Sequence, residues 1–371
     1  MKAVVVLFMM SLSAAALAEQ LPPIKTVFVI LMENKDWAQV KNSPDAPFIN
    51  SVLLPQASYC ENYHTPPLLQ PSEPNYLWLE AGTNFGLYNN DDPVLNHQST
   101  TNHLVTQLFN AGISWRTYQE DIDGTYVPLT ETNGYAPKHN PFVFFDDVTG
   151  TNSPDYAYGI EHIRPVSELW SDLASNKLAR YNFITPNLCH DMHSPCGPLN
   201  NLVQQGDNWL SSSVPAILNS ESFRDNGALF IAWDEGDEDS YAPPIGMILL
   251  SPLAKGGGYA STNFYNHSSL LRTWQEIFGV RPLLGDAINA QNLADLFLTI
   301  KLTYIEQQAD GAMQVTASGV RPGRTNIFLV SSNMFDWIPI STNYATNNEI
   351  SITDYSAPKG STRFYRLLQV P

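Results

Sequence analysis

Two continuous apolar runs, each ending abruptly in oxygen-bearing side chains, constrain the fold of this chain more than any other feature. The runs cover residues 27–32 and 228–233. The residues that follow them are Glu33, Asn34, Asp234 and Glu235. Six consecutive apolar residues are too few for a core helix and are typical of a strand buried on both faces. Because ligands bind beyond the carboxyl ends of strands in an open parallel sheet, both runs predict a site at one sheet edge.

The region up to about residue 300 alternates between strand-like and helix-like segments. Further strands are predicted over residues 113–118, 181–185 and 245–250. Helices are predicted over residues 51–54, 103–111, 166–179, 209–218 and 268–278. This alternation predicts an α/β fold with a mostly parallel central sheet and helices on both faces.

The chain changes character after about residue 301. Short runs of period two follow one another, separated by Gly, Asn and Pro, over residues 313–317, 326–330, 350–353 and 363–367. They predict a small antiparallel β module over residues 301–371, after a larger domain over residues 19–300. The module shows no catalytic constellation, so we expect a binding or spacer role for it.

The N-terminus has the pattern of a secretory signal. Lys2 precedes an apolar stretch over residues 4–12, and Ala16, Leu17 and Ala18 form a small-residue cleavage site. We expect residues 1–18 to be removed and the mature protein to be secreted or periplasmic. The apolar stretch is too short for a membrane anchor, and no later segment is long and apolar enough for membrane insertion.

The formal net charge of −17 limits the partners of the chain. An acidic surface argues against binding of nucleic acid and of anionic membranes. It does not exclude an anionic substrate, because a bound metal ion can reverse the local field.

The three cysteines are Cys60, Cys189 and Cys196. Cys189 and Cys196 flank a loop that carries His and Asp residues, and a disulfide between them would make that loop rigid. A zinc site is a second interpretation, although the cysteine spacing matches no standard structural finger. Cys60 is either a buried thiol or the partner of one of the other two.

Ser72 precedes an apolar helical run, with Pro74 in its first turn. A serine at this position can be an N-cap. It can also be a nucleophile, because the backbone donors and positive dipole end of a helix suit a phosphoryl oxyanion. A serine hydroxyl becomes a good nucleophile only when a metal or a base activates it. The two interpretations are compatible.

Five short motifs occur in a fixed order, over residues 32–35, 71–76, 138–142, 185–193 and 233–235. Together they resemble the phosphoesterase family of bacterial acid phosphatases and phospholipases C, within the alkaline-phosphatase-like superfamily. The resemblance covers about residues 24–280 and leaves out the tail. It implies an alkaline-phosphatase-like catalytic domain over residues 19–300 that hydrolyses phosphate esters through a phosphoserine.

The resemblance also implies a role for each matching residue. The metal ligands would be Glu33, Asn34, Ser72, Asp191, Asp234 and Glu235. The catalytic residues would be Ser72 as nucleophile, His193 and His267. The phosphate-binding residues would be Lys138, His139, Asn75 and Asn34. Hard oxygen ligands suit one or two divalent metal ions, which would stabilise a serine alkoxide and the transferring phosphoryl group. A histidine could protonate the leaving alkoxide.

The chain departs from the family pattern at two places. Gln70 stands where the family has a histidine before Pro-Ser, with His64 nearby. The segment over residues 236–244 lacks the histidine that usually follows the Trp-Asp-Glu motif. These changes leave the nucleophile and the metal ligands intact and affect the expected leaving-group preference.

Other functions fit less well. A sulfatase-like hydrolase of the same superfamily would have an arginine where Tyr76 stands. A glycoside hydrolase needs two facing carboxylates, whereas Asp234 and Glu235 are adjacent. A non-enzymatic surface- or carbohydrate-binding protein would explain the tail but not the two polar strand ends. We expect a small-molecule or lipid phosphate ester as substrate, with monoester, diester and phosphocholine substrates all open.

Overall fold

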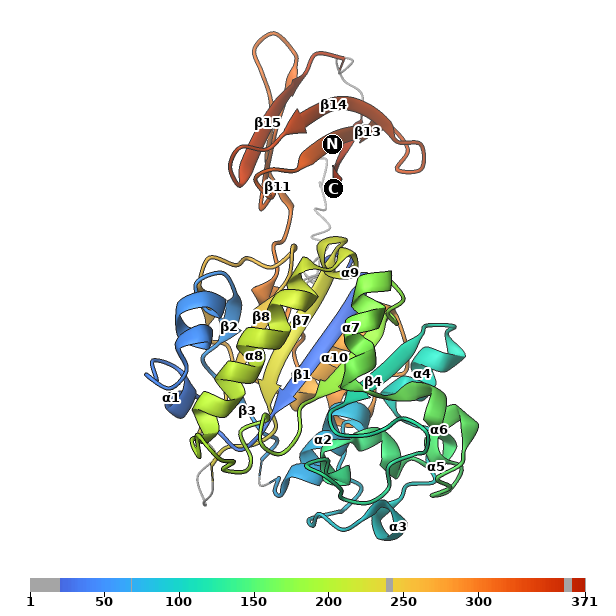
Figure 1. Ribbon diagram of the computed structural model, residues 1–371. Helices are drawn as coiled ribbons and strands as arrows, with labels where there is room; N and C mark the ends of the chain where they lie inside the picture. Colours follow the sequence, from blue (N-terminus) through green and yellow to red (C-terminus); the bar gives the residue numbers. More distant parts are fainter. Residues whose placement is uncertain (1–20, 68, 238–242, 357–361, 371) are drawn as a thin grey trace, which may run out of the picture.

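The computed structural model describes residues 21–67, 69–237, 243–356 and 362–370 (Figure 1). The predicted signal peptide and its cleavage near Ala18 lie outside these residues. The centre of the molecule is an eight-stranded sheet in the order β5-β4-β6-β1-β7-β8-β2-β9. Its strands in chain order are β1 Thr26–Met32, β2 Ser58–Cys60, β4 Trp115–Gln119, β5 Ile163–Pro165, β6 Tyr181–Thr185, β7 Gly227–Trp233, β8 Met247–Leu250 and β9 Tyr259–Ser261.

The sheet is mostly parallel, as predicted. Within it, only β8 runs antiparallel to its neighbours β7 and β2. The two apolar runs are the adjacent central strands β1 and β7, and every residue of β7 is buried. Their parallel register pairs Met32 with Trp233, so Glu33 and Asp234 leave the sheet side by side.

Helices cover both faces of this sheet (Figure 1). Helices α7 and α8 lie over one face, and α10 lies on the other, packed against α2. The α-helices are α1 Trp37–Val40, α2 Ser72–Ala81, α3 Pro93–Asn96, α4 Leu104–Asn110, α5 Asp146–Thr149, α6 Ala157–His162, α7 Val166–Ser175, α8 Leu202–Asn219, α9 Glu221–Arg224 and α10 His267–Phe278. The predicted α/β fold class is confirmed.

Shorter elements connect these layers. They are the helical turns η1 Ile49–Leu53, η2 Pro137–His139, η3 Pro141–Phe144, η4 Gly285–Ile288 and η5 Ala294–Leu296, and the paired strands β3 Tyr63–His64 and β10 Tyr265–Asn266.

Helix α8 begins seven residues before its predicted start at residue 209. After Leu202 and Val203, residues 204–208 carry no apolar side chain and so give no apolar spacing, but the Asn201 side chain accepts a hydrogen bond from the Gln204 amide and caps the helix. The carboxylate of Asp207, inside this helix, accepts the Phe48 and Ile49 amides at 2.9 and 2.8 Å. Asp207 therefore caps η1, which joins α8 to the loop after β1.

The tail forms two three-stranded antiparallel sheets, in the orders β11-β12-β15 and β14-β13-β16. Their strands are β11 Lys301–Gln307, β12 Met313–Ser318, β13 Thr325–Ser331, β14 Ile338–Tyr344, β15 Glu349–Asp354 and β16 Phe364–Val370. The module has an apolar cluster of its own around Val315 and Phe328, separate from the cluster that surrounds β1. Two separate cores support the proposed division near residue 300.

Candidate active site

Ser72 is the first residue of α2, and its side chain points away from its own helix backbone. Pro71 occupies the N-cap position, so Ser72 is not the cap. The buried Ser72 hydroxyl donates instead to Glu33 Oε2 at 2.9 Å and lies 3.5 Å from Glu235 Oε1. The hydroxyl thus stands at the positive end of a ten-residue helix, facing the ends of both central strands.

Backbone hydrogen bonds hold these strand ends together. The Glu33 amide donates to the Asp191 carbonyl at 2.7 Å, and the Asp234 amide donates to the Met32 carbonyl at 3.0 Å. The Asn34 amide donates to Asp234 Oδ1 at 3.0 Å. Three segments far apart in the sequence therefore present their acidic side chains at one edge of the sheet.

The acidic side chains Glu33, Asp191 and Asp234 are fully buried. Burial, and then the neighbouring carboxylates, hold the pKa of Glu33 well above its ordinary value. Burial likewise raises the pKa of Asp191, and it raises the pKa of Asp234 to about 6. Burying several ionised carboxylates together costs free energy unless a cation neutralises them, so this cluster favours a bound cation.

Oxygen atoms without partners mark where that cation would fit. Glu33 Oε1, Asn34 Oδ1 and Asp234 Oδ2 are buried and have no hydrogen-bond partner among the described residues. Asn75 Nδ2 donates to Glu235 Oε2 at 3.2 Å, so its amide orients a fourth oxygen-bearing side chain. This set of hard oxygen donors fits a divalent metal ion.

His139 lies between two of the acidic side chains. Its Nδ1 is 3.1 Å from Asp191 Oδ2, and its Nε2 is 3.3 Å from Glu33 Oε2. The ring stacks on Tyr76 with 5.3 Å between centroids. Burial, with Lys138 and His193 close by, holds the pKa of His139 well below its ordinary value. This shift favours the neutral imidazole, which is the form that binds a metal.

His193 stands beside His139 and pairs with Lys138, whose Nζ is 3.0 Å from His193 Nε2. Burial and the charges of Lys138 and Lys35 lower the pKa of His193 to about 4. Ligand atoms of Glu33, His139 and His193 all lie within 4.8 Å of one another. These three side chains form a second place where a metal ion could be held.

His267, the first residue of α10, is placed differently from the other predicted site residues. Its Nε2 contacts the Asp234 carbonyl oxygen at 2.6 Å, and its Nδ1 contacts the Tyr63 hydroxyl at 2.8 Å. Burial lowers its pKa to about 4. Both ring nitrogens of His267 therefore have protein partners in this structure.

Lys35 is a site residue to which the sequence analysis gave no role. It is buried, and its Nζ donates to the Asn34 carbonyl and lies 3.9 Å from Asp237 Oδ2. It brings a positive charge next to the acidic strand ends. Its position in the sequence, directly after the predicted ligands Glu33 and Asn34, could have indicated that Lys35 lies at the site.

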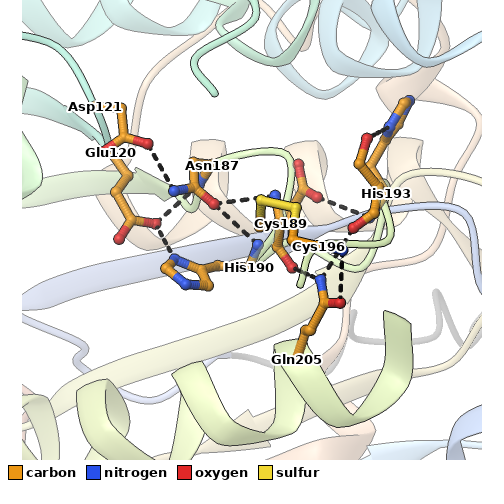
Figure 2. Close-up of a disulfide and its surroundings, with 10 residues drawn as sticks. Glu120, Asp121, Asn187, Cys189, His190, His193, Cys196 and Gln205 are labelled. Atoms are coloured by element: carbon orange, nitrogen blue, oxygen red, sulfur yellow. Dashed lines mark hydrogen bonds and ion pairs between the residues drawn. A yellow bond between two sulfur atoms is a disulfide. The ribbon is translucent and has the colours of Figure 1, made fainter. Parts of the chain in front are cut away.

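The loop after β6 is fixed by a disulfide between Cys189 and Cys196 (Figure 2). Gln205 of α8 donates to the Cys189 carbonyl at 2.7 Å and accepts the Cys196 amide at 2.9 Å. Asn187 Oδ1 accepts the Cys189 amide at 3.0 Å. The disulfide excludes a zinc site built on these two sulfurs, and Cys60 is a buried free thiol.

This bridged loop supplies two of the site residues. Asp191 Oδ1 accepts the His193 amide at 2.8 Å, which fixes both side chains relative to each other. His190 points the other way, toward Glu120 at 2.9 Å, and Figure 2 shows His193 on the opposite side of the disulfide. The bridge therefore holds Asp191 and His193 toward the strand ends.

Comparison with known proteins identifies the class to which this fold and site belong. The model of the Phosphoesterase family matches residues 42–281, and the chain belongs to this family. The protein is therefore a hydrolase of phosphoric ester bonds, as the resemblance in the sequence predicted.

Three relatives show the range of the family. A phosphatidylinositol-3-phosphatase of Mycobacterium tuberculosis is 30% identical over 76% of this chain and 85% of its own length. A phosphate-repressible acid phosphatase of Penicillium chrysogenum is 30% identical over 70% of this chain and 61% of its own length. A non-hemolytic phospholipase C of Pseudomonas aeruginosa is 22% identical over 71% of this chain and 47% of its own length.

Among solved structures, the chain also has a distant similarity to an alkaline phosphatase. The alkaline phosphatase of the Antarctic bacterium TAB5 aligns with a TM-score of 0.43 at 9% identity, over 70% of this chain and 100% of that chain.

Proposed function

We propose that this protein is an exported, metal-dependent phosphoesterase of the acid phosphatase or phospholipase C type, with Ser72 as nucleophile. The main support for this proposal is the position of the Ser72 hydroxyl. The Ser72 hydroxyl lies at the N-terminus of α2, 2.9 Å from a carboxylate oxygen of Glu33, at a buried cluster of oxygens that lack partners.

In the proposed mechanism, Glu33 and the N-terminus of α2 assist the two steps of phosphoryl transfer. Glu33 Oε2 accepts the hydrogen of the Ser72 hydroxyl, so the oxygen lone pair can face an entering phosphorus atom. Attack forms the Oγ–P bond and breaks the bond from phosphorus to the leaving oxygen, while the serine proton passes to Glu33 Oε2 and on to the leaving oxygen. Water then attacks phosphorus and breaks the Oγ–P bond, one water proton passes through Glu33 back to Ser72 Oγ, and phosphate or a phosphate ester is released. The positive end of α2 stabilises the phosphoryl oxygens throughout.

The metal would be held by the oxygen donors at the strand ends. The proposed ligands are Glu33, Asn34, Ser72, Asp191, Asp234 and Glu235, and the cluster of Glu33, His139 and His193 marks a second position. When bound, a divalent cation supplies charge that favours the serine alkoxide and the transferring phosphoryl group.

The remaining predicted residues take distinct roles in this proposal. Lys138 lies beside His193 and can bind phosphoryl oxygens through its ammonium group. Asn75 keeps Glu235 in place. We assign His267 a positioning role in place of proton transfer, because its nitrogens are bonded to Asp234 and Tyr63.

Export is supported by the signal-like N-terminus and by the disulfide, since disulfides persist in oxidising compartments. No helix among the described residues could cross a membrane. The substrate class is a small-molecule or lipid phosphate ester, supported by relatives named acid phosphatase and phospholipase C.

The test compares p-nitrophenyl phosphate with a phosphorylcholine ester as substrates of the purified protein. We expect chelation to abolish turnover, a divalent metal to restore it, and Ser72→Ala to lower it by about a thousandfold or more. Ser171→Ala, an exposed serine on α7, is the matched control and should keep wild-type turnover. Wild-type turnover in folded Ser72→Ala would overturn the nucleophile, and turnover unchanged by chelation would overturn the metal.

A further inference from the structure

The β module differs from the rest of the protein in charge. The whole chain carries −17, yet residues 301–371 carry a formal charge of +1. The basic residues of this segment are Lys301, Arg321, Arg324, Lys359, Arg363 and Arg366, and the acidic ones are Glu306, Asp310, Asp336, Glu349 and Asp354. A chain with such an excess of carboxylates has concentrated cations on one small module.

Three of these arginines have no anionic partner in the part of the chain that the structure describes. Arg363 pairs with Asp354, as most arginines of the larger domain pair with a carboxylate. By contrast, the guanidinium groups of Arg321, Arg324 and Arg366 make no hydrogen bond or ion pair with any described residue. Arg321 Nη1 is buried and has no partner among the described residues. Burial, and then the nearby charge of Arg324, lower the pKa of Arg321.

Arg324 and Arg366 line a cleft of about 390 Å³ between the module and the larger domain. The other walls are mainly apolar, and they include Leu253, Leu298, Ile300 and Leu368. The Leu368 side chain is 43% exposed, so an apolar surface is open to a ligand there. A space of this size is sufficient for a small molecule.

The cleft lies at the far end of the sheet from the candidate active site. Its lining includes Pro23, shortly before β1 begins, and Asn226, directly before β7 begins. Glu33 and Asp234 follow the opposite ends of the same two strands. Figure 1 shows both strand arrows pointing away from the module. A ligand in the cleft therefore does not occupy the site of phosphoester hydrolysis.

We propose that this cleft binds an amphiphilic anion, with the acidic group on Arg324 and Arg366 and the apolar body against the leucine-lined wall. Unpaired guanidinium groups beside a cleft bind carboxylate, sulfonate or phosphate groups through charge-assisted hydrogen bonds. The apolar wall gains free energy from burial against an alkyl chain. The same chemistry could come from a free amphiphile or from a lipid headgroup with its chain.

Isothermal titration of the purified protein with octanesulfonate tests the proposal, because a sulfonate cannot be hydrolysed by a phosphoesterase. We expect octanesulfonate to bind and ethanesulfonate to bind at least about tenfold more weakly. Arg324→Gln with Arg366→Gln should weaken octanesulfonate binding by about tenfold or more, while turnover of p-nitrophenyl phosphate stays at the wild-type level.

The control removes two positive charges elsewhere, through Lys177→Gln with Arg281→Gln, and should leave the affinity unchanged. Equal weakening in this control, no loss in the cleft variant, or equal binding of the two sulfonates would each overturn the proposal. Flotation with phosphatidylcholine vesicles, with and without phosphatidylglycerol, distinguishes a membrane lipid from a free amphiphile as the ligand. Arginine-dependent binding to phosphatidylglycerol vesicles identifies a lipid, and binding of octanesulfonate alone identifies a free amphiphile.

Discussion

At the scale of single residues, burial decides what each charged group in this protein can do. Glu33 is fully buried, accepts a hydrogen bond from the Ser72 hydroxyl and has three further carboxylates nearby, so its surroundings favour a proton or a metal ion. His267 is equally buried, but its nitrogens are already used by Tyr63 and by the Asp234 carbonyl. Two residues taken from one family pattern therefore differ in what they can offer a substrate.

Glu80 gives a prediction on the pH dependence of stability. It is fully buried on α2, accepts a hydrogen bond from the Tyr181 hydroxyl at 3.1 Å, and has its pKa raised by burial from 4.5 to about 8. The folded protein thus holds this proton more tightly than the unfolded chain does. The stability contributed by Glu80 is complete below about pH 4.5 and is lost as the pH rises to about 8.

Glu80→Gln keeps the shape of the neutral side chain and removes this titration. We expect the melting temperature of the variant, relative to the wild type, to rise between about pH 5 and about pH 8. Thermal unfolding followed by circular dichroism at several pH values measures the difference. Parallel pH curves for the two proteins would show that Glu80 does not titrate in this window.

At the scale of secondary-structure elements, strand ends and one bridged loop build the site. The strands β1 and β7 were predicted within one residue, because unbroken apolar runs leave little ambiguity about a buried strand. The start of α8 was missed, because residues 204–208 interrupt the apolar period and the helix begins at the cap formed by Asn201. Similarly, β11 and β14 were not predicted, since both lie at sheet edges with mostly exposed side chains.

The bridged loop gives the second prediction. Replacing Cys189 and Cys196 together by serine frees the loop that carries Asp191 and His193. For a loop of this length we expect a loss of about 2–3 kcal/mol in the free energy of unfolding. We also expect turnover to fall, because both side chains lose their fixed position. A phosphine reductant should lower the turnover of the wild type to that of the double variant and leave the variant unchanged. Full activity in the reduced wild type would contradict this role of the bridge.

At the scale of the whole molecule, the larger domain and the β module each have a hydrophobic core of their own. The sheet core carries the strand ends of the candidate site, and the smaller core around Phe328 belongs to the β module. None of the residues proposed for hydrolysis lies beyond residue 300. The module is thus expected to add binding rather than chemistry.

Truncation after residue 300 is the corresponding experiment. We expect the shortened protein to stay folded and to retain most of its turnover of p-nitrophenyl phosphate, because its core is complete without the module. Octanesulfonate binding should disappear, since Arg324, Arg366 and Leu368 are removed. Circular dichroism first checks that the truncated protein is folded. Its turnover and its octanesulfonate binding are then compared with those of the full chain. Loss of turnover in a folded truncated protein would show that the module takes part in hydrolysis.

The sequence by itself determined the central strands, the position of Ser72 at the N-terminus of a helix and the family to which the chain belongs. These features depend on local patterns, namely apolar period, turn chemistry and short motifs in order. The tertiary structure alone decided which polar side chains meet. His139 contacts Glu33 and Asp191, and Arg324 and Arg366 line one cleft with residues near the starts of β1 and β7, so both places join segments distant in the chain. Their geometry follows from packing around the sheet, which no local pattern contains.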